Sequence, residues 1–313
     1  MTSAQPIRIG TRASPLARWQ AQWVSDALTA AGHSTLLVPI STRGDFQQFQ
    51  PVEQLGDRGV FTKELQRALL AGEIDVAVHS LKDLPTEPVA ALILTAVPRR
   101  ESPCDVLVSR NGLLLETLPP GARVGTGSLR RQSQLLHRRP DMVVAPIRGN
   151  VDTRLHKLDE GQYDALILAQ AGLHRLELSH RVTQVLPTNQ MLPAVGQGAL
   201  GLEARAEDQA IRAALAALDD PASHMAVVAE RSLLESLDGG CLAPIGALAT
   251  VVSHNGRMRL EGVVLSRDGV NRLHGSVEGE VAEAIELGRR LAGLLLEQGA
   301  AALIRAARHG VEL

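Results

Sequence analysis

Arginine is concentrated in one stretch of this chain. Seven arginines, no lysine and only two acids, Asp141 and Asp152, lie between Arg123 and Arg154. The whole chain is close to neutral, with 32 basic and 34 acidic residues. Planar guanidinium groups can hold carboxylate or phosphate oxygens with two hydrogen bonds at once. A cationic stretch on a nearly neutral chain therefore favours a specific anionic ligand over general binding to polyanions.

The placement of these arginines supports that interpretation. A solvated face is the alternative, because the chain has only three lysines and uses arginine almost everywhere. The arginines, however, follow strand-like segments, in loops and first helical turns, where α/β proteins bind ligands. The segment Gly125–Arg130 begins like a dinucleotide-binding motif but lacks its third glycine. We interpret it as a helix capped by Ser128, whose first N–H groups face an anion together with Arg130 and Arg131.

A second candidate for chemistry is the pair Lys82-Asp83, which follows an apolar strand-like run. Lys82 is one of only three lysines, which indicates that a compact ammonium group is selected at this position. Asp83 could orient a substrate amine or stabilise a developing cation. The alternative is a loop ion pair, with Asp83 as a helix cap.

The chain has two cysteines, Cys104 and Cys241, far apart in sequence. They form no disulfide framework, which fits a reducing cytoplasm. Cys241 follows two glycines, so its backbone leaves room for a large group beside the sulfur. The alternatives are a small buried residue or a Cys–His nucleophile, although the spacing singles out no partner histidine.

Composition argues against several classes of function. The ten histidines form no close grouping with one another or with cysteine, so no metal site is expected. Three Phe, two Trp and one Tyr offer few platforms for stacking bases, so we expect no nucleic-acid partner. No apolar run is long enough to span a bilayer and the start does not resemble a signal peptide. A soluble protein without a membrane partner is expected.

The elements that would position these residues alternate between strands and helices. Strands are predicted at 7–9, 35–40, 74–78, 91–97, 106–108, 123–125, 142–147 and 165–169, and helices at 15–28, 61–70, 129–137 and 151–159. This alternation predicts parallel sheets in two doubly wound α/β lobes with a cleft between them.

A different pattern begins near residue 220 and predicts a small α+β domain. A helix at 223–237 precedes strands at 248–252, 258–266 and 270–277, and one long amphipathic helix covers 282–307. Asn255-Gly256 and Asp268-Gly269, between the strands, are strong hairpin-turn signals.

An ordered set of motifs resembles the porphobilinogen deaminase (hydroxymethylbilane synthase) family over nearly the whole chain. The motifs are Thr11-Arg-Ala-Ser-Pro-Leu-Ala17, Thr42-Arg-Gly-Asp45, Phe61-Thr-Lys-Glu-Leu65, His79-Ser-Leu-Lys-Asp-Leu-Pro85, Ser128-Leu-Arg-Arg-Gln132, Ile147-Arg-Gly-Asn150, Leu192-Pro-Ala-Val-Gly-Gln-Gly198 and Gly239-Gly-Cys241. The resemblance implies a cytoplasmic, monomeric transferase of tetrapyrrole biosynthesis. It would join four porphobilinogen molecules head to tail, release ammonia each time and yield hydroxymethylbilane.

The resemblance also implies an architecture. The two lobes would resemble type II periplasmic binding proteins. Residues 1–98 with 198–218 would form the first α/β domain, 99–197 the second, and 219–313 an α+β domain that carries the cofactor cysteine.

Residue roles follow from matching positions in the motifs. Cys241 would carry a covalent dipyrromethane cofactor on its sulfur, and Asp83 would be the essential acid that promotes loss of the aminomethyl nitrogen and stabilises cationic intermediates. Cofactor contacts are implied for Asp45, Ser80, Lys82, Thr126, Ser128, Arg130 and Arg131. Substrate contacts are implied for Arg12, Ser14, Arg148, Arg154, Arg175 and Gln197, and for Arg58 and Phe61 of a lid whose Asp57 departs from the usual family pattern.

The arginines then have a physical purpose, because every pyrrole unit bears an acetate and a propionate. Each charge-assisted hydrogen bond contributes about 1.5–3 kcal/mol, so several arginines can hold a growing anionic chain. The alternative class is a non-enzymatic anion-binding protein with an arginine-lined cleft. That hypothesis leaves the Gly-Gly-Cys motif and the third domain without a purpose.

Overall fold

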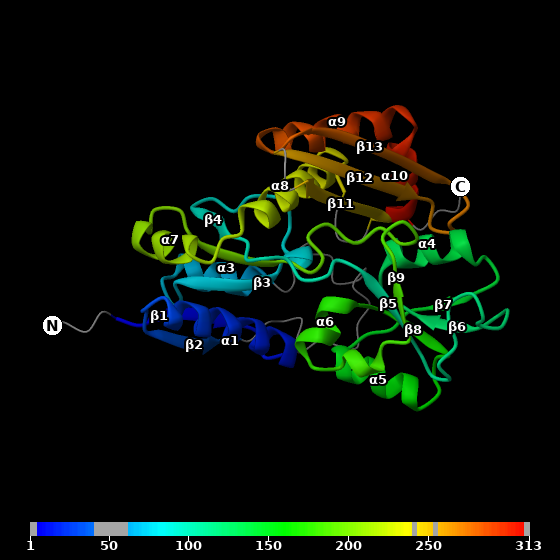
Figure 1. The fold of residues 1–313 in the computed structure, drawn as a ribbon, viewed down its shortest axis with the longest axis horizontal. Helices are drawn as coiled ribbons and strands as arrows, with labels where there is room; N and C mark the ends of the chain where they lie inside the picture. The colour runs from blue at the N-terminus through cyan, green and yellow to red at the C-terminus, as the bar shows by residue number, and fades with distance from the viewer. Residues whose placement is uncertain (1–4, 41–61, 240–242, 253–255, 310–313) are drawn as a thin grey trace. The chain divides into compact units, whose positions relative to one another are not determined.

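A computed structural model describes residues 5–40, 62–239, 243–252 and 256–309 of the chain. Its contacts form two compact units, Met1–Glu101 with Ala199–His224, and Ser102–Gly198 with Met225–Leu313. Three separate sheets lie in these units (Figure 1). The prediction of two α/β sheets followed by a small α+β part is confirmed. The cleft between lobes and the three-domain boundaries stay predictions.

The first unit contains a five-stranded sheet in the order β2-β1-β3-β10-β4. Its strands are β1 (Ile7–Thr11), β2 (Thr35–Pro39), β3 (Val76–Ser80), β4 (Leu92–Ala96) and β10 (Leu200–Arg205), and its helices are α1 (Pro15–Ala30), α3 (Lys63–Leu70), the short η2 (Leu81–Asp83) and α7 (Gln209–Ala216). Strand β1 pairs in parallel with β2 and β3, whereas β10 is antiparallel to β3 and β4.

Alternate residues of β3 face helices on opposite sides of the sheet. Val76 and Val78 belong to the core that contains Val24 of α1, whereas Ala77 packs in the core that contains Leu65 of α3. This period of two is the expected consequence of the pleated strand. Both faces of β3 are therefore buried, which explains its continuous apolar sequence.

Helix α1 begins where the sequence predicts. Ser14 is its N-cap, with its side chain accepting a hydrogen bond from the N–H of Ala17, and Pro15 occupies the first position. The cap fixes the turn that leaves β1, so Arg12 and Ser14 are held at the end of that strand.

The second unit contains a sheet with the same pattern, in the order β7-β6-β8-β5-β9. Its strands are β5 (Asp105–Ser109), β6 (Arg123–Gly125), β7 (Val143–Ala145), β8 (Ala165–Ala169) and β9 (Gln184–Leu186), and the helices beside it are α4 (Leu129–Arg138), α5 (Val151–Asp159), α6 (Gln170–Arg175) and the short η3 (Ser179–Arg181). Strand β6 is parallel to β7 and β8, and β5 is antiparallel to β8 and β9.

The prediction of parallel sheets fails at one strand in each sheet. The fourth strand, β10 in the first sheet and β5 in the second, runs against its neighbours. Neither strand reaches its place through a strand–helix–strand crossover, which is the connection that imposes parallel pairing. Helical alternation in the sequence indicates the crossovers, but it shows neither the direction of β5 nor the insertion of β10 between β3 and β4.

The second unit also holds a three-stranded antiparallel sheet, β11-β12-β13. The elements of this part of the chain are α8 (Pro221–Ser236, which belongs to the second unit from Met225 onward), β11 (Ile245–Val252), β12 (Arg257–Leu265), β13 (Arg272–Glu280), the short η4 (Val281–Glu283), α9 (Ala284–Glu297) and α10 (Ala300–His309). Helices α8, α9 and α10 share one buried core with the sheet, which includes Leu233, Leu260 and Leu291. In Figure 1, α9 lies along β13 and β12.

The single long helix predicted at the end of the chain is wrong, because the structure divides it into α9 and α10. The break is at Gly299, whose φ of 103° lies in the left-handed region. The N–H of Gly299 donates to the carbonyl of Leu296, which closes the last turn of α9. An amphipathic pattern can continue across such a break, so the pattern alone does not reveal it.

Asp75, which directly precedes β3, should make the stability of the first unit depend on pH. Burial raises its pKa, but hydrogen bonds from Arg8 and Arg205 outweigh burial and lower the pKa to about 2. A carboxylate whose folded-state pKa lies below its unfolded value of about 3.9 stabilises the fold above that pH and loses the effect as pH falls towards the folded value.

We therefore expect Asp75→Asn to lower the free energy of unfolding by about 1–2 kcal/mol at pH 6. The difference from the native chain should shrink between pH 4 and 2, because Asp75 then becomes protonated in the native chain as well. Urea unfolding at both ends of this range measures the difference. An equal difference at every pH would contradict the ion-pair interpretation.

Candidate functional site

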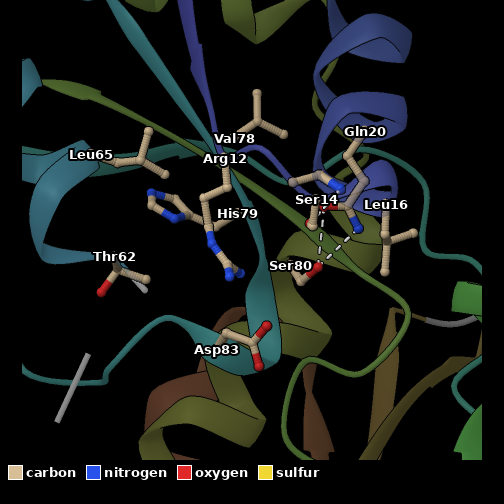
Figure 2. Close-up of a pocket in the computed structure, with 11 residues that line it drawn as sticks. Arg12, Ser14, Leu16, Gln20, Thr62, Leu65, Val78, His79, Ser80 and Asp83 are labelled. Atoms are coloured by element: carbon tan, nitrogen blue, oxygen red, sulfur yellow. Dashed lines mark hydrogen bonds between the residues drawn. The ribbon is translucent and has the colours of Figure 1, made fainter. Parts of the chain in front are cut away.

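Functional residues of the first unit meet at the carboxyl edge of its sheet. Strands β1 and β3 are parallel neighbours, so the residues that follow them lie at one edge. Arg12 follows β1, whereas Ser80 ends β3 and Asp83 ends η2. A pocket opens there (Figure 2), lined by Arg12, Ser14, Leu16, Ala17, Gln20, Thr62, Leu65, Val78, His79, Ser80 and Asp83.

The end of β3 is held from both faces of the sheet. On the α1 face, the Ser80 hydroxyl lies 2.9 Å from Nε2 and 3.1 Å from Oε1 of the buried Gln20. On the α3 face, His79 Nε2 lies 3.1 Å from Glu203 Oε2, and Gln66 Nε2 donates to Glu203 Oε1 at 3.1 Å. These bonds fix the strand from which η2 projects Asp83.

The pocket combines groups of opposite charge. Asp83 is exposed to solvent, and Arg12 is half-buried. Figure 2 shows the Arg12 guanidinium extending into the region between His79 and Asp83. A guanidinium with a carboxylate nearby suits a ligand that carries both an acidic and a cationic group.

The second unit presents a similar edge. Strands β6, β7 and β8 are parallel, so the segments after them lie at the same end of the sheet. Predicted site residues follow each strand: Thr126, Ser128, Arg130 and Arg131 after β6, Arg148 and Arg154 after β7, and Arg175 after β8. Parallel pairing thus gathers residues that are far apart in sequence.

Arg130 and Arg131 lie in a buried cluster around Asp105, which we call the Asp105 cluster. Arg130 Nη1 donates to Asp105 Oδ2 at 2.7 Å, and Arg131 Nη2 donates to Oδ1 at 2.7 Å. Gln197 Nε2 also donates to Oδ1, at 2.9 Å. Asp105 and Gln197 are 0% exposed, and Arg130 is 3% exposed. Buried ion pairs therefore hold Arg130 and Arg131 at the carboxyl edge of this sheet.

The charges in the Asp105 cluster do not balance. Burial raises the pKa of Asp105, but the charges of Arg130 and Arg131 and their hydrogen bonds outweigh it and hold the pKa well below its usual range. The carboxylate is thus ionised between two guanidinium groups, which leaves one excess positive charge. In the described part of the chain, Arg130 Nε is buried without a hydrogen-bond partner. Both features favour an anionic ligand.

The helix start at Ser128 differs in detail from the prediction. Ser128 is the N-cap residue of α4, but its side chain makes no capping hydrogen bond, so the prediction of a serine-capped helix is wrong on this point. Its backbone N–H donates to Thr126 Oγ1 at 3.2 Å instead. At the start of α5, by contrast, Asn150 caps the helix through its side chain, with Asn150 Oδ1 accepting from the N–H of Thr153 at 2.9 Å.

The arginine-rich stretch is not one continuous surface. Arg138 and Arg139 form ion pairs with Glu116 and Asp141, and Arg123 lies over the ring of Tyr163 at 5.3 Å from its centroid. Arg148 and Arg154 are half-buried beside the start of α5, where Arg154 Nε donates to the carbonyl of Gly149. Arg175 is 8% exposed and donates to the carbonyl of Gly198 at 2.7 Å.

Of the remaining predicted site residues, the structure describes only Lys82 among Lys82, Asp45, Arg58, Phe61 and Cys241. Lys82 is half-buried in η2 next to Asp83. Asp45, Arg58, Phe61 and Cys241 lie outside the described residues. Within the described residues, no group of three or more His, Cys, Asp or Glu side chains could hold a metal ion. No helix in the described ranges is both long and apolar enough to cross a membrane.

Four residues that support these sites were not predicted from the sequence, namely Gln20, His79, Asp105 and Glu203. Each is a polar residue on an apolar, buried stripe: Gln20 precedes Ala21 and Val24 of α1, and Glu203 interrupts the apolar run of β10. A buried polar side chain in such a stripe requires a partner, and that requirement is the signal that could have found them.

Comparison with known proteins places this geometry in a family. The family model described as "Porphobilinogen deaminase, dipyromethane cofactor binding domain" matches residues 7–213, and the one described as "Porphobilinogen deaminase, C-terminal domain" matches residues 224–297. The porphobilinogen deaminase of Pelotomaculum thermopropionicum is 49% identical over 305 residues, covering 97% of this chain and 97% of that protein. That of Desulforudis audaxviator is 50% identical over 306 residues, covering 97% and 98%.

Solved structures that resemble the chain include a nutrient-binding protein from Burkholderia cenocepacia bound to methionine. It is 13% identical with a TM-score of 0.43, covering 73% of this chain and 94% of that one. The two family models and the full-length relatives cover both units described above. The chain therefore belongs to the porphobilinogen deaminase family.

Proposed function

We propose that the pocket around Asp83 binds the reacting end of porphobilinogen and that the Asp105 cluster binds the acidic side chains of the dipyrromethane cofactor. The chain is a hydroxymethylbilane synthase, a transferase of tetrapyrrole biosynthesis. It polymerises four porphobilinogen molecules head to tail on a covalent dipyrromethane primer. The observation that carries the assignment of roles is the shared pocket of Asp83 and Arg12.

The role of Asp83 follows from charge. Porphobilinogen carries an aminomethyl group that leaves as ammonia, and positive charge develops on the ring as it departs. A carboxylate beside that ring stabilises the developing charge and can hold the amine in place. Arg12, in the same pocket, can bind an acetate or propionate of the same molecule with its planar guanidinium. Ser14 and Ser80 supply hydroxyl groups at the pocket wall.

The Asp105 cluster fits the cofactor because it combines an excess positive charge with a buried donor, Arg130 Nε. The bound cofactor supplies the pyrrole carbon to which the first substrate unit is joined. Thr126 and Ser128 are the polar residues that lead into this cluster from β6, and we assign Lys82 and Asp45 to the cofactor as well. We assign Gln197 to holding the arginines, since it donates to Asp105 and to the carbonyl of Pro103.

Arg148, Arg154 and Arg175 are assigned to the acidic side chains of the growing chain, because they follow β7 and β8 at the same sheet edge as the Asp105 cluster. The predicted lid residues Arg58 and Phe61 would close over substrate. We further propose a monomer in the cytoplasm, with no nucleic-acid partner and with three domains at the boundaries that the resemblance implies.

The attachment of the primer is tested by the intact mass of the purified chain and of Cys241→Ser. The native chain should exceed its sequence mass by two porphobilinogen units less the ammonia released on attachment, and the variant should show no excess. An unmodified native chain would be incubated with porphobilinogen, since an apo-enzyme then gains the adduct. A chain that binds porphobilinogen without gaining mass would instead support the non-enzymatic anion-binding class.

A further inference from the structure

The reaction requires a proton acceptor as well as a group that stabilises positive charge. Each condensation breaks the C–N bond of one aminomethyl group, and ammonia leaves with the electron pair. The free α-carbon of the accepting pyrrole then forms a C–C bond to that methylene. This carbon must lose its proton, so that the electrons of the C–H bond restore the aromatic ring.

Asp83 is poorly suited to both tasks at once. A carboxylate stabilises a neighbouring cation only while it is ionised, and accepting the proton would remove its charge. A second group that can hold a proton in the same pocket would allow Asp83 to remain charged. Among the residues that line the pocket, His79 carries an imidazole ring, and a neutral imidazole has one nitrogen whose lone pair can accept a proton.

The surroundings of His79 resemble those of an oriented base. Its ring is hydrogen-bonded through Nε2 to Glu203 Oε2 at 3.1 Å, and the other carboxylate oxygen is held by Gln66. Glu203 is 5% exposed, so the carboxylate is fixed in the interior. A carboxylate that accepts the Nε2 proton selects one tautomer and leaves the lone pair on Nδ1. Within the described residues, the hydrogen bonding of His79 is confined to Nε2.

We propose that His79, oriented by Glu203, accepts at Nδ1 the proton that the pyrrole α-carbon loses in each condensation. The proton then passes to water or to the released ammonia, which departs as ammonium, so the ring is neutral again before the next unit binds. Figure 2 shows His79 on β3 and Asp83 on the turn that follows, both at the wall of one pocket. Glu203 is a positioning residue, because it acts through His79.

The first test uses His79→Gln and Glu203→Gln with porphobilinogen deuterated at its free α-carbon. Both variants should turn over about 10²-fold or more slowly. Both should also show a deuterium isotope effect on turnover that is larger than in the native enzyme, because proton removal becomes rate-limiting. A histidine that only fills space would lower stability without changing the isotope effect. Slow turnover with an unchanged isotope effect, or near-native turnover, would overturn the proposal.

A control variant separates this effect from loss of stability. Asp75→Asn breaks ion pairs with Arg8 and Arg205 in the same unit, and neither arginine lines the pocket. It should destabilise the chain but leave the isotope effect at its native value. If His79→Gln does not fold, the isosteric Glu203→Gln carries the kinetic test.

A second readout does not depend on turnover. In nitrogen-15 NMR of histidine-labelled protein, the native His79 ring should carry its hydrogen on Nε2 and a bare Nδ1, assigned by the signals that His79→Gln removes. Glu203→Gln should alter that tautomer balance. A native ring with the hydrogen on Nδ1 would overturn the proposal even if the variants were slow. Both variants should carry the primer, so their intact masses should exceed their sequence masses by the same amount as the native chain. A variant with the primer but with slow turnover separates this proposal from the test of Cys241.

Discussion

Asp83→Asn is expected to lose a factor of about 10²–10⁴ in the rate of hydroxymethylbilane formation. Asparagine has nearly the shape of aspartate but no charge, so it cannot stabilise the cation that forms as ammonia leaves. Asp83 is exposed and ends a short helix, so its replacement removes no core contact. The variant should therefore keep the native fold, the native unfolding midpoint and the native primer mass. The rate is measured under saturating porphobilinogen.

The matched control for this prediction is Asp26→Asn. Asp26 is also an exposed acid of the first unit, and it accepts a hydrogen bond from Gln22 on the surface of α1. The control should turn over at nearly the native rate. If Asp83→Asn were equally active, Asp83 would have no catalytic role and the pocket would need another source of charge stabilisation.

Asp105→Asn should produce the largest change in stability, a loss of about 3–5 kcal/mol in the free energy of unfolding. The substitution leaves Arg130 and Arg131 buried without the carboxylate that they share. Uncompensated buried charge is costly because the interior cannot replace the hydration of the guanidinium groups. In the native chain this contribution is complete above the unfolded-state pKa of about 3.9 and persists into stronger acid, since the folded-state pKa of Asp105 is held well below its usual range.

Asp141→Asn provides the comparison, because it removes an aspartate–arginine pair from the same unit. Arg139 Nη2 and Asp141 Oδ2 are 2.7 Å apart, but the Asp141 side chain is 34% exposed. Solvent screens an exposed ion pair, so the control should be much less destabilised than Asp105→Asn. Urea unfolding followed by circular dichroism measures both variants. Equal losses in the two variants would show that the Asp105 cluster tolerates its excess charge by other means.

Much of the local structure followed from the sequence. The alternation of strands and helices, the capped start of α1 at Ser14 and the turn at Asp268-Gly269 depend on neighbouring residues only. The same is true of the motifs that indicated the family, because each is a short run of residues. Local sequence is informative here since caps, turns and amphipathic faces are satisfied within a few residues of the chain.

Pairings between distant residues needed the tertiary structure. Strand β10 enters the first sheet between β3 and β4, and that insertion alone brings Glu203 to His79. The division of the final helix at Gly299 likewise depends on a single backbone angle that an apolar pattern does not reveal.

The arginine-rich stretch shows the limit of sequence most clearly. In the sequence, Arg130, Arg131, Arg138 and Arg139 belong to one cationic stretch. The acids within that stretch are Asp141 and Asp152. In the structure, Asp105 comes from an earlier strand and separates the run into a buried pair and a surface pair. Charge type and spacing were determined by the sequence. Burial and partner were decided by the fold, because they depend on which strands the sheet brings together.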